Sequence, residues 1–279
     1  MTKLLQFLAL ATFFVMNVFA NDELIKLTPD NFALIKGPID GASVDQVVKD
    51  MYAIEGDTVY LYFDTPGGSV MDGNGVIDAM ETLTHMGKDV ICVADTAISM
   101  GFVIFQHCPV RYVRPRAVLM QHQMSLGVRG QLENLKSRLE LVQSLDDQLS
   151  QVQADRLKLT VDEFKSKTNN DWWMYGKDVL ENGAADDVVN VMCDFDYREE
   201  TFVVDYMTMF GPVHVTFSKC PLIKQPLALS FNEETQRKMN EANADPNTFA
   251  DHVREQLSQI DQFESYDSFD HCSYKKCIA

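Results

Sequence analysis

Positive charge is scarce in this sequence, in which 24 lysine and arginine residues stand against 41 aspartate and glutamate residues. The formal net charge of −17 disfavours a surface that follows the phosphates of DNA or RNA, so we expect no nucleic-acid partner. The sequence also contains no Walker A loop for ATP, no internal repeat and no glycine- and serine-rich linker. Any domain boundary must therefore be found from a change of sequence pattern.

A long apolar stretch is also missing after the first twenty residues. Those residues carry one lysine, an apolar stretch from Leu4 to Val18 and a small residue at Ala20, which is the layout of a cleaved secretory signal peptide. An uncleaved signal anchor is the alternative, although the stretch is shorter than the roughly 20 residues that a bilayer span needs. We predict a signal peptide over residues 1–20 and an exported protein, periplasmic or secreted, with a membrane-anchored form as the alternative.

Export would expose the six cysteines to oxidising conditions. Four of them fall in the C-terminal third of the chain: Cys193, Cys220, Cys272 and Cys277. We expect one or two disulfides there, with a connectivity that the spacing does not fix. Cys92 and Cys108 lie in or beside apolar runs and are interpreted as packing residues. His271 next to Cys272 is at most half a metal site, because no second cluster follows at ligand spacing, so we expect no metal and no cofactor.

The segment 96–101 joins two apolar runs. The run before it, 89–94, is typical of a buried parallel strand, and the run after it, 102–105, indicates a buried helix. A small polar residue at such a junction, here Ser99, stands at the elbow where α/β hydrolases expose a nucleophilic hydroxyl beside free backbone N–H groups. The alternative is that Ser99 only caps the new helix.

Two further segments follow predicted strands. The turn Pro66-Gly67-Gly68 comes after a strand at 58–63 and has no Cβ atom at two successive positions, so a ligand could approach the backbone there. A purely structural turn is the alternative. His122 follows the apolar run 118–120 and stands at the edge where loops gather in α/β folds, although a histidine at that place is often a solvated or packing residue.

Residues 131–159 form the longest predicted helix. Its apolar residues recur three and four positions apart: Leu132, Leu135, Leu139, Val142, Leu145, Leu149 and Val152. Polar residues fill the positions between them, so we expect this helix to pack against another helix and to mediate oligomerisation. A surface helix that lies on its own sheet is the alternative. Beyond residue 192 the pattern changes to a hairpin, 202–217, and an acidic helical tail, 232–263.

Four segments, taken together and in order, resemble the proteolytic subunit of the Clp protease, a serine peptidase of the ClpP/crotonase superfamily. They are residues 60–70 with the Pro-Gly-Gly turn, Ala97-Ile98-Ser99-Met100-Gly101, Met120-Gln121-His122-Gln123, and Asp171-Trp172-Trp173-Met174 with the later Asn182-Gly183-Ala184-Ala185-Asp186. The resemblance covers roughly residues 30–192. It implies an α/β fold, a ClpP/crotonase-type spiral of β-β-α units with a long protruding helix, to which this chain adds a small C-terminal α+β extension. We predict a peptidase domain over residues 21–192 and an extension of unknown role over residues 193–279.

The resemblance also implies a role for each site residue. Ser99 is similar to the family's nucleophile, His122 to its general base and Asp171 to its orienting carboxylate. Gly68 and Met100 would supply the backbone N–H groups of the oxyanion hole. These residue types suit the chemistry, because a serine hydroxyl needs a neutral imidazole to take its proton and a carboxylate to hold the tautomer.

Members of this family assemble as two stacked seven-membered rings, with the long helix between the rings and the sites facing an inner chamber. The resemblance therefore implies a homo-oligomer of heptameric rings that cuts peptides or unfolded protein segments. This chain departs from the family at Ile98 and at Trp172-Trp173, which are bulkier than usual, and in having a signal-like segment and an extension. ATP is scarce outside the cytoplasm, so we expect an ATP-independent peptidase without an ATPase partner.

Three other functions compete with this prediction. The chain could be a catalytically inactive scaffold or binding module of the same fold, in which Asp171 is held away from His122. An acyl-CoA hydratase or hydrolase would use the same paired N–H groups, but export would remove it from acyl-CoA. A serine–lysine peptidase would need a lysine entering the site, and no motif supplies one.

Overall fold

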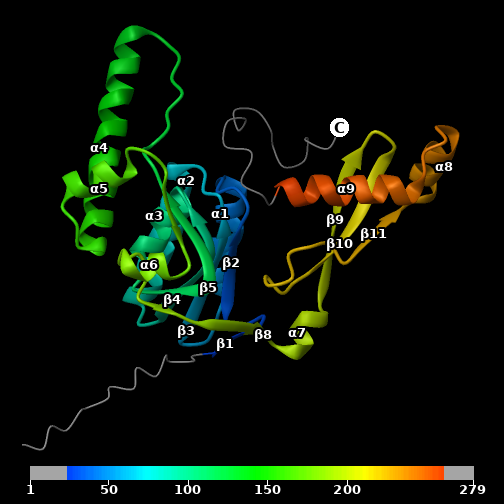
Figure 1. Cartoon of the computed structure of the whole chain (residues 1–279), viewed down its shortest axis with the longest axis horizontal. Helices are drawn as coiled ribbons and strands as arrows, with labels where there is room; N and C mark the ends of the chain where they lie inside the picture. The colour runs from blue at the N-terminus through cyan, green and yellow to red at the C-terminus, as the bar shows by residue number, and fades with distance from the viewer. Residues whose placement is uncertain (1–23, 261–279) are drawn as a thin grey trace, which may run out of the picture.

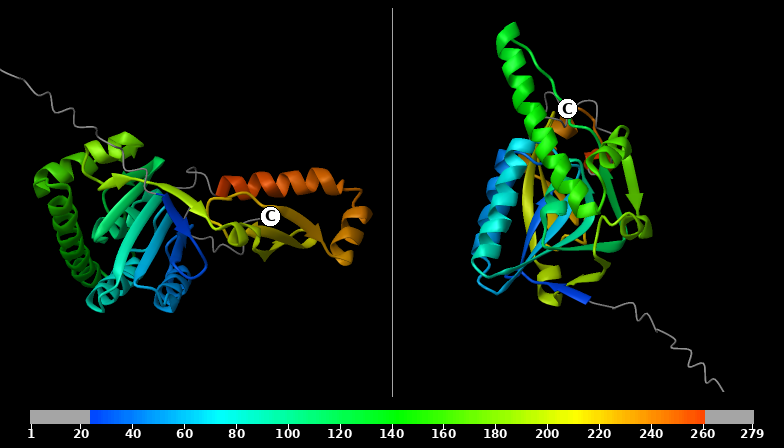
Figure 2. Two further views of the ribbon diagram at one scale, coloured as in Figure 1. Left: turned by 90° about the horizontal axis from the view of Figure 1, so that it is seen from below. Right: turned by 90° about the vertical axis from the view of Figure 1, so that its left-hand side faces the viewer.

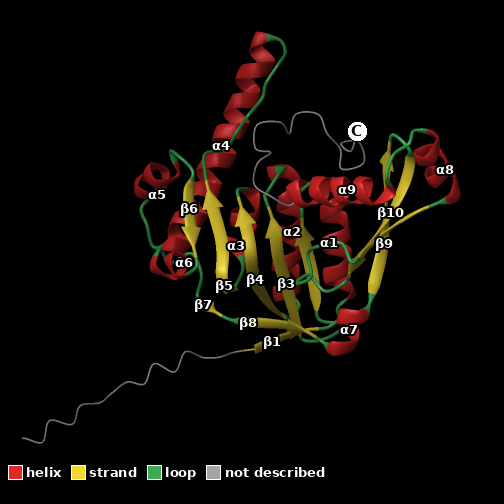
Figure 3. Cartoon of the chain, turned by 45° about the vertical axis from the view of Figure 1, so that its right-hand side comes forward, coloured by secondary structure: helices red, strands yellow, loops and turns green. Residues whose placement is uncertain are grey.

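The computed structural model describes residues 24–260, which are built around a six-stranded sheet (Figure 3). Its strands are β2 (Phe32–Lys36), β3 (Thr58–Thr65), β4 (Asp89–Ile98), β5 (Val110–Gln121), β6 (Trp172–Tyr175) and the short β7 (Asp187–Val188). Strands β2 to β5 are parallel neighbours, β6 pairs antiparallel with β5, and β7 pairs with β5 on the other part of its length. Parallel strands of this kind place the loops that follow them at one edge of the sheet.

Three helices cover one face of this sheet: α1 (Gly41–Ala53), α2 (Val70–His85) and α3 (Met100–His107). Alternate residues of β3, Val59, Leu61 and Phe63, belong to the same buried cluster as the apolar residues of these helices. This alternation follows from the period of two in a strand, which sends every second side chain to one face. The largest core of the described residues therefore lies between the sheet and the three helices.

The opposite face carries a smaller apolar cluster. Two parallel strands, β1 (Leu24–Leu27) and β8 (Asn190–Cys193), pair with each other and contribute to it. Tyr62, which lies between Leu61 and Phe63 on β3, points to this face and is fully buried in the cluster together with Val93 and Cys220. Residues from the start of the described chain and from the segments that follow β7 thus complete this side of the sheet.

A long helix, α4 (Leu132–Leu157), stands out from the body of the molecule (Figure 1). Its described buried residues are all in its last turns, from Ser150 to Leu157. Two shorter helices follow it, α5 (Val161–Thr168) and α6 (Lys177–Glu181). The alternative of a helix lying along its own sheet is therefore wrong for most of α4.

The C-terminal extension forms a separate small sheet beside the first one (Figure 2). After the short helix α7 (Phe195–Glu199), its elements are β9 (Thr201–Thr208), β10 (Gly211–Ser218), β11 (Ala228–Phe231), α8 (Glu233–Glu241) and α9 (Pro246–Ile260). The strands are antiparallel, and α9 contributes Val253 and Leu257 to their apolar core. The predicted hairpin and helical tail are confirmed as far as the described residues reach.

The predicted α/β fold with a long protruding helix and a C-terminal α+β part is confirmed by this architecture. The domain limits, 21–192 and 193–279, remain a prediction. The predicted signal peptide, residues 1–20, lies outside the described residues. Within residues 24–260, no helix combines the length and apolar character that a membrane span requires.

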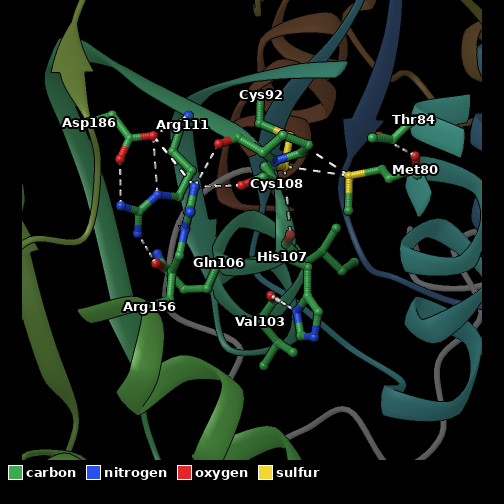
Figure 4. Close-up of a disulfide and its surroundings, with 12 residues drawn as sticks. Met80, Thr84, Cys92, Val103, Gln106, His107, Cys108, Arg111, Arg156 and Asp186 are labelled. Carbon is green, nitrogen blue, oxygen red and sulfur yellow. Dashed lines mark hydrogen bonds and ion pairs between the residues drawn. A yellow bond between two sulfur atoms is a disulfide. The ribbon is translucent and has the colours of Figure 1, made fainter. Parts of the chain in front are cut away.

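Two disulfides join the four cysteines of the described chain, which leaves none of these four as a free thiol. Cys193 pairs with Cys220, as expected for the C-terminal third. Cys92 pairs with Cys108, so the interpretation of these two as packing residues was wrong (Figure 4). Cys92 lies on β4 and Cys108 directly follows α3. Because α3 returns along β4, the two side chains meet in the core. Cys272 and Cys277 lie outside the described residues.

Candidate active site

Ser99 occupies the sharp turn between β4 and α3. Its φ of 53° and ψ of −118° lie in a region that residues other than glycine rarely adopt. The backbone is held there by a 2.9 Å hydrogen bond from the Ser99 N–H to the carbonyl of Met120 on β5. The Ser99 side chain makes no capping hydrogen bond to α3, so the capping alternative is wrong. Its hydroxyl is instead presented at the edge of the sheet.

His122 directly follows β5 on the neighbouring strand. Its Nε2 lies 2.8 Å from the Ser99 Oγ, within hydrogen-bond distance. The backbone N–H of His122 donates to the side-chain carbonyl of Gln121 at 3.1 Å. The side-chain amide of Gln121 in turn donates to the side-chain carbonyl of the buried Gln153 of α4. This chain of amides fixes the end of β5, and with it the backbone that carries the imidazole.

Asp171 comes immediately before β6. Because β5 and β6 are antiparallel with Gln121 opposite Trp172, the next position outward brings His122 and Asp171 together. The Asp171 Oδ1 lies 3.9 Å from the His122 Nδ1, which is longer than a hydrogen bond, and the side chain of Asp171 is 56% exposed. Hydrogen bonds between catalytic groups are often longer than normal before substrate binds.

The glycine turn lies directly against the elbow. A Cβ atom on Gly67, whose φ is +90°, would come within 2.5 Å of the Ile98 carbonyl and 2.9 Å of the Met100 nitrogen. Only glycine therefore fits at this position. The Ile39 N–H donates to the Gly67 carbonyl, and the Ile39 carbonyl accepts the Ser69 N–H, both at 2.8 Å. The Gly68 N–H lies between these two hydrogen bonds and therefore points away from Ile39. Met100 is the first residue of α3, where an N–H has no partner within the helix.

Thr65 braces this turn and was missed by the sequence analysis. Its fully buried hydroxyl donates to the Gly37 carbonyl at 2.6 Å and accepts the Gly67 N–H at 3.0 Å. Its methyl group also lies 2.6 Å from the position of a Cβ on Gly101 in α3. A threonine just before a Pro-Gly-Gly turn was the available signal, since a short hydroxyl side chain can bond the backbone of a turn.

The structure therefore brings all five predicted site residues to one edge of the sheet. Ser99 and His122 are within hydrogen-bond distance, Asp171 is next to His122, and Gly68 and Met100 belong to the segments that meet at the elbow. A hydroxyl beside an imidazole and two backbone N–H groups can carry out acyl transfer. The individual catalytic roles remain a prediction.

A metal cluster and the surface hollows were the other candidates for a site in the described part of the chain. In residues 24–260, no three or more side chains of histidine, cysteine, aspartate or glutamate gather as a metal site would require. Two surface hollows of about 440 and 370 Å³ both include Arg156 in their walls, and neither is lined by Ser99, His122 or Asp171. The convergence of side-chain chemistry, rather than the size of a hollow, identifies the site.

Comparison with known proteins agrees with this geometry. The family model of the Clp protease matches residues 19–192. The ATP-dependent Clp protease proteolytic subunit 1 of Prochlorococcus marinus (strain NATL2A) is 28% identical over 175 residues, which cover 59% of this chain and 86% of that protein. The proteolytic subunit 2 of Parasynechococcus marenigrum (strain WH8102) is 31% identical over 158 residues, which cover 53% of this chain and 77% of that protein. The chain therefore belongs to the Clp protease family and is a serine-type peptidase.

Proposed function

We propose that this chain is an exported, ATP-independent serine endopeptidase that hydrolyses peptides or unfolded protein segments through an acyl-enzyme on Ser99, His122 and Asp171. The observation that supports this most directly is the 2.8 Å distance between the His122 Nε2 and the Ser99 Oγ at a strained elbow. A hydroxyl held in this way can lose its proton to the imidazole as it attacks.

In the proposed mechanism, Ser99 Oγ attacks the carbonyl carbon of the scissile bond while His122 Nε2 takes the hydroxyl proton. The oxygen of the tetrahedral intermediate accepts hydrogen bonds from the N–H groups of Gly68 and Met100. His122 then gives the proton to the leaving amine, which departs and leaves the acyl group on Ser99. A water molecule, deprotonated by His122, attacks the ester and releases the acid.

Each group has an expected share in the rate. Proton transfer by a positioned histidine contributes about 10²–10⁴-fold, and one oxyanion donor about 10²–10³-fold. Asp171 would orient the His122 ring and stabilise the imidazolium, which requires the 3.9 Å separation to shorten when substrate binds.

The proposal of export is supported by the cysteines. Cys92–Cys108 and Cys193–Cys220 are both disulfide-bonded, and structural disulfides persist mainly in oxidising compartments. Such compartments contain little ATP, so we propose that no ATPase delivers substrate to this chain. The two curated relatives described above are named as subunits of an ATP-dependent protease, and this chain would differ from them in that respect.

We also propose a homo-oligomer, with heptameric rings as in the family, assembled through α4. Leu132 and Leu139 on this helix are 67% and 48% exposed in the single chain. A row of exposed apolar side chains on a protruding helix favours contact with another copy. Native mass spectrometry of Leu139→Glu should show smaller assemblies than the wild type. Arg138→Glu, the neighbouring exposed position, is the matched control and should assemble normally.

The activity is tested by labelling the purified protein with a fluorophosphonate, which traps activated serines. Wild type should be labelled, whereas Ser99→Ala and His122→Ala should not. Ser144→Ala, on the exposed surface of α4, and His85→Ala, at the exposed end of α2, are matched controls and should be labelled like the wild type. A folded wild type that is not labelled would contradict the proposal.

A catalytically inactive scaffold is the second candidate, and the exposure of Asp171 together with its 3.9 Å separation favours it. The Asp171→Asn variant separates the two functions. In a working triad, loss of this carboxylate lowers the rate by about 10⁴-fold. Equal labelling of wild type and Asp171→Asn, at a low rate, would instead indicate that Asp171 is not coupled to His122.

A further inference from the structure

The segment 219–227, between β10 and β11, fastens the extension to the peptidase sheet, and we call it the strap. Its Cys220 is disulfide-bonded to Cys193 and is buried. Its Leu222 and Ile223 pack against the cluster that contains Tyr62 and Val93 of the sheet. The strap therefore contacts the face of the sheet opposite the three helices.

Lys224 of the strap reaches two carboxylates of the peptidase domain. Its Nζ lies 2.8 Å from the Asp64 Oδ1 on β3 and 2.7 Å from the Asp95 Oδ2 on β4. The two aspartate side chains are only 14% and 15% exposed. Arg114 of β5 contacts the other oxygen of Asp95 at 3.1 Å. Lys224 is thus the cation shared by the two aspartates.

The electrostatics of this cluster depend on Lys224. Burial disfavours the charged ammonium, but the two adjacent carboxylates outweigh this effect and raise the pKa of Lys224 above its ordinary value. Without the ammonium, Asp64 and Asp95 would face each other while only Asp95 kept its contact with Arg114. Two partly buried carboxylates in that position repel each other and displace the strand ends that carry them.

Asp64 is close to the oxyanion turn along the chain. The next residue, Thr65, accepts the Gly67 N–H at 3.0 Å, and Gly67 lies so close to the elbow that a Cβ on it would come within 2.9 Å of the Met100 nitrogen. The Asp64 carbonyl also accepts the Gly37 N–H at 3.0 Å. A displacement of Asp64 would therefore be passed to Gly67 and Gly68 through Thr65.

We propose that Lys224 is a positioning residue for the oxyanion turn, so that the C-terminal extension supplies part of the framework of the active site. This inference rests on the proposed function for its catalytic consequence. Lys224 itself does not touch the reacting atoms. It acts by holding Asp64 and Asp95 at their present separation.

The first test compares fluorophosphonate labelling and peptide hydrolysis in Lys224→Met and in Lys219→Met. Lys219 is the matched control, because it lies on the same strap but, within residues 24–260, forms an ion pair only with the exposed Glu200, at 2.8 Å. We expect Lys224→Met to lower kcat by roughly tenfold to a hundredfold, since a small misplacement of catalytic groups has effects of this size. KM should change little, because the oxyanion contact strengthens in the transition state. Lys219→Met should behave like the wild type.

Two further variants separate positioning from simple attachment. Lys224→Arg keeps the charge and should retain most of the activity. Lys224→Met combined with Asp64→Asn removes the unpaired carboxylate and should recover activity relative to Lys224→Met alone. The proposal would be overturned if the double variant were no more active than Lys224→Met, or if Lys224→Met had a normal kcat. Labelling of the wild type would still uphold the peptidase activity in either case.

Hydrogen exchange gives a readout that needs no activity. The amides of Asp64, Thr65, Gly67 and Gly68 should exchange faster in Lys224→Met than in the wild type and in Lys219→Met. If the wild type is not labelled by the fluorophosphonate, the peptidase proposal fails but this comparison still decides the structural role of Lys224. Unchanged exchange at these amides would overturn the proposal that Lys224 positions the oxyanion turn.

Discussion

One face of the six-stranded sheet is covered by helices, and the other by two short strands and the strap. On the helix face, Phe63 is fully buried and packs edge-on against Phe105 of α3, with ring centres 5.5 Å apart. On the strap face, Tyr62 of the same strand is buried next to a cluster of charged groups, Asp64, Asp95 and Lys224. Neighbouring residues of one strand thus meet very different surroundings.

This difference follows from which parts of the chain cover each face. The helix face is built from helices that follow directly after strands β2, β3 and β4, so local patterns supply its apolar stripe. The strap face is built from β1 and β8, which are far from each other in sequence, and from residues 219–227, which are far from the sheet strands. The site is therefore supported by a local apolar layer on one side and by long-range ion pairs and a disulfide on the other.

The largest expected effect is the loss of a core side chain from the helix face. Phe63→Ala should lower the free energy of unfolding by about 3–5 kcal/mol, because it removes a buried aromatic ring and leaves a cavity. Leu222→Ala, at a partly buried position of the strap, should lower it by about 1–2 kcal/mol. Urea unfolding of both variants measures the difference. Equal losses would mean that the two faces contribute alike.

The two disulfides provide the next comparison, because one lies on each face. Replacing Cys92 and Cys108 by alanine, or Cys193 and Cys220 by alanine, should each remove about 3 kcal/mol of stability through the entropy of the unfolded chain. Their sequence separations are 16 and 27 residues, so the second pair should have the slightly larger effect. Thermal unfolding of both double variants checks this order. Both pairs should also change the rate of labelling, the first because it encloses Ser99 and the second because it anchors the strap that carries Lys224.

A smaller effect should depend on pH. Burial favours the neutral form of Asp186, but hydrogen bonds from Arg111 outweigh this and hold the pKa of its carboxyl below the ordinary value. The pair therefore stabilises the fold above the ordinary pKa of aspartate, and this contribution is lost as the pH falls through the lowered pKa. Asp186→Asn should destabilise the protein by about 1 kcal/mol at neutral pH, since Asp186 is 39% exposed, and by less near pH 3.

The matched control for this prediction is Asp251→Asn, an exposed aspartate of α9 that pairs with Arg254 at 2.8 Å. Its removal should change stability by a few tenths of a kcal/mol at most. Unfolding curves at several pH values give both results. A constant difference between wild type and Asp186→Asn from pH 3 to pH 7 would contradict the assigned role.

The smallest expected effect is a gain. Ser99 has a positive φ that strains any residue with a Cβ atom, so Ser99→Gly should stabilise the fold by up to about 1 kcal/mol while it abolishes labelling. Ser99→Ala keeps the strain and should show no such gain. Thermal unfolding of the two variants separates strain from the loss of the hydroxyl. A glycine variant no more stable than the alanine variant would show that the elbow is not strained.

Much of the helix face and of the site could be predicted from the sequence, because local patterns determine them. The apolar runs around Ser99 and the glycines at positions 67 and 68 are short-range signals. Asp171 was different: no local pattern marked it, and only the resemblance to the family indicated its role. The strand register that brings it next to His122 appears only in the folded sheet.

The remaining contacts could not be predicted because they join distant residues. Cys92 and Cys108 look like ordinary core residues, and only the return of α3 along β4 brings their sulfur atoms together. Lys224 lies 160 residues from Asp64, in a segment with no pattern that marks a partner. Hydrophobic periodicity predicts which residues are buried, but it carries no information on such pairings.

The pairing of β1 with β8 has a consequence for how the chain folds. Leu24 is opposite Asn190, so a strand near the start of the described chain has to wait for a partner that is synthesised much later. Closing so long a loop is slow, and contacts of this kind form late in folding. We therefore expect β1 to join last, after the helix-covered face has already formed, and a nascent chain that ends before residue 190 to expose the apolar cluster around Tyr62 to whatever chaperone or protease meets it first.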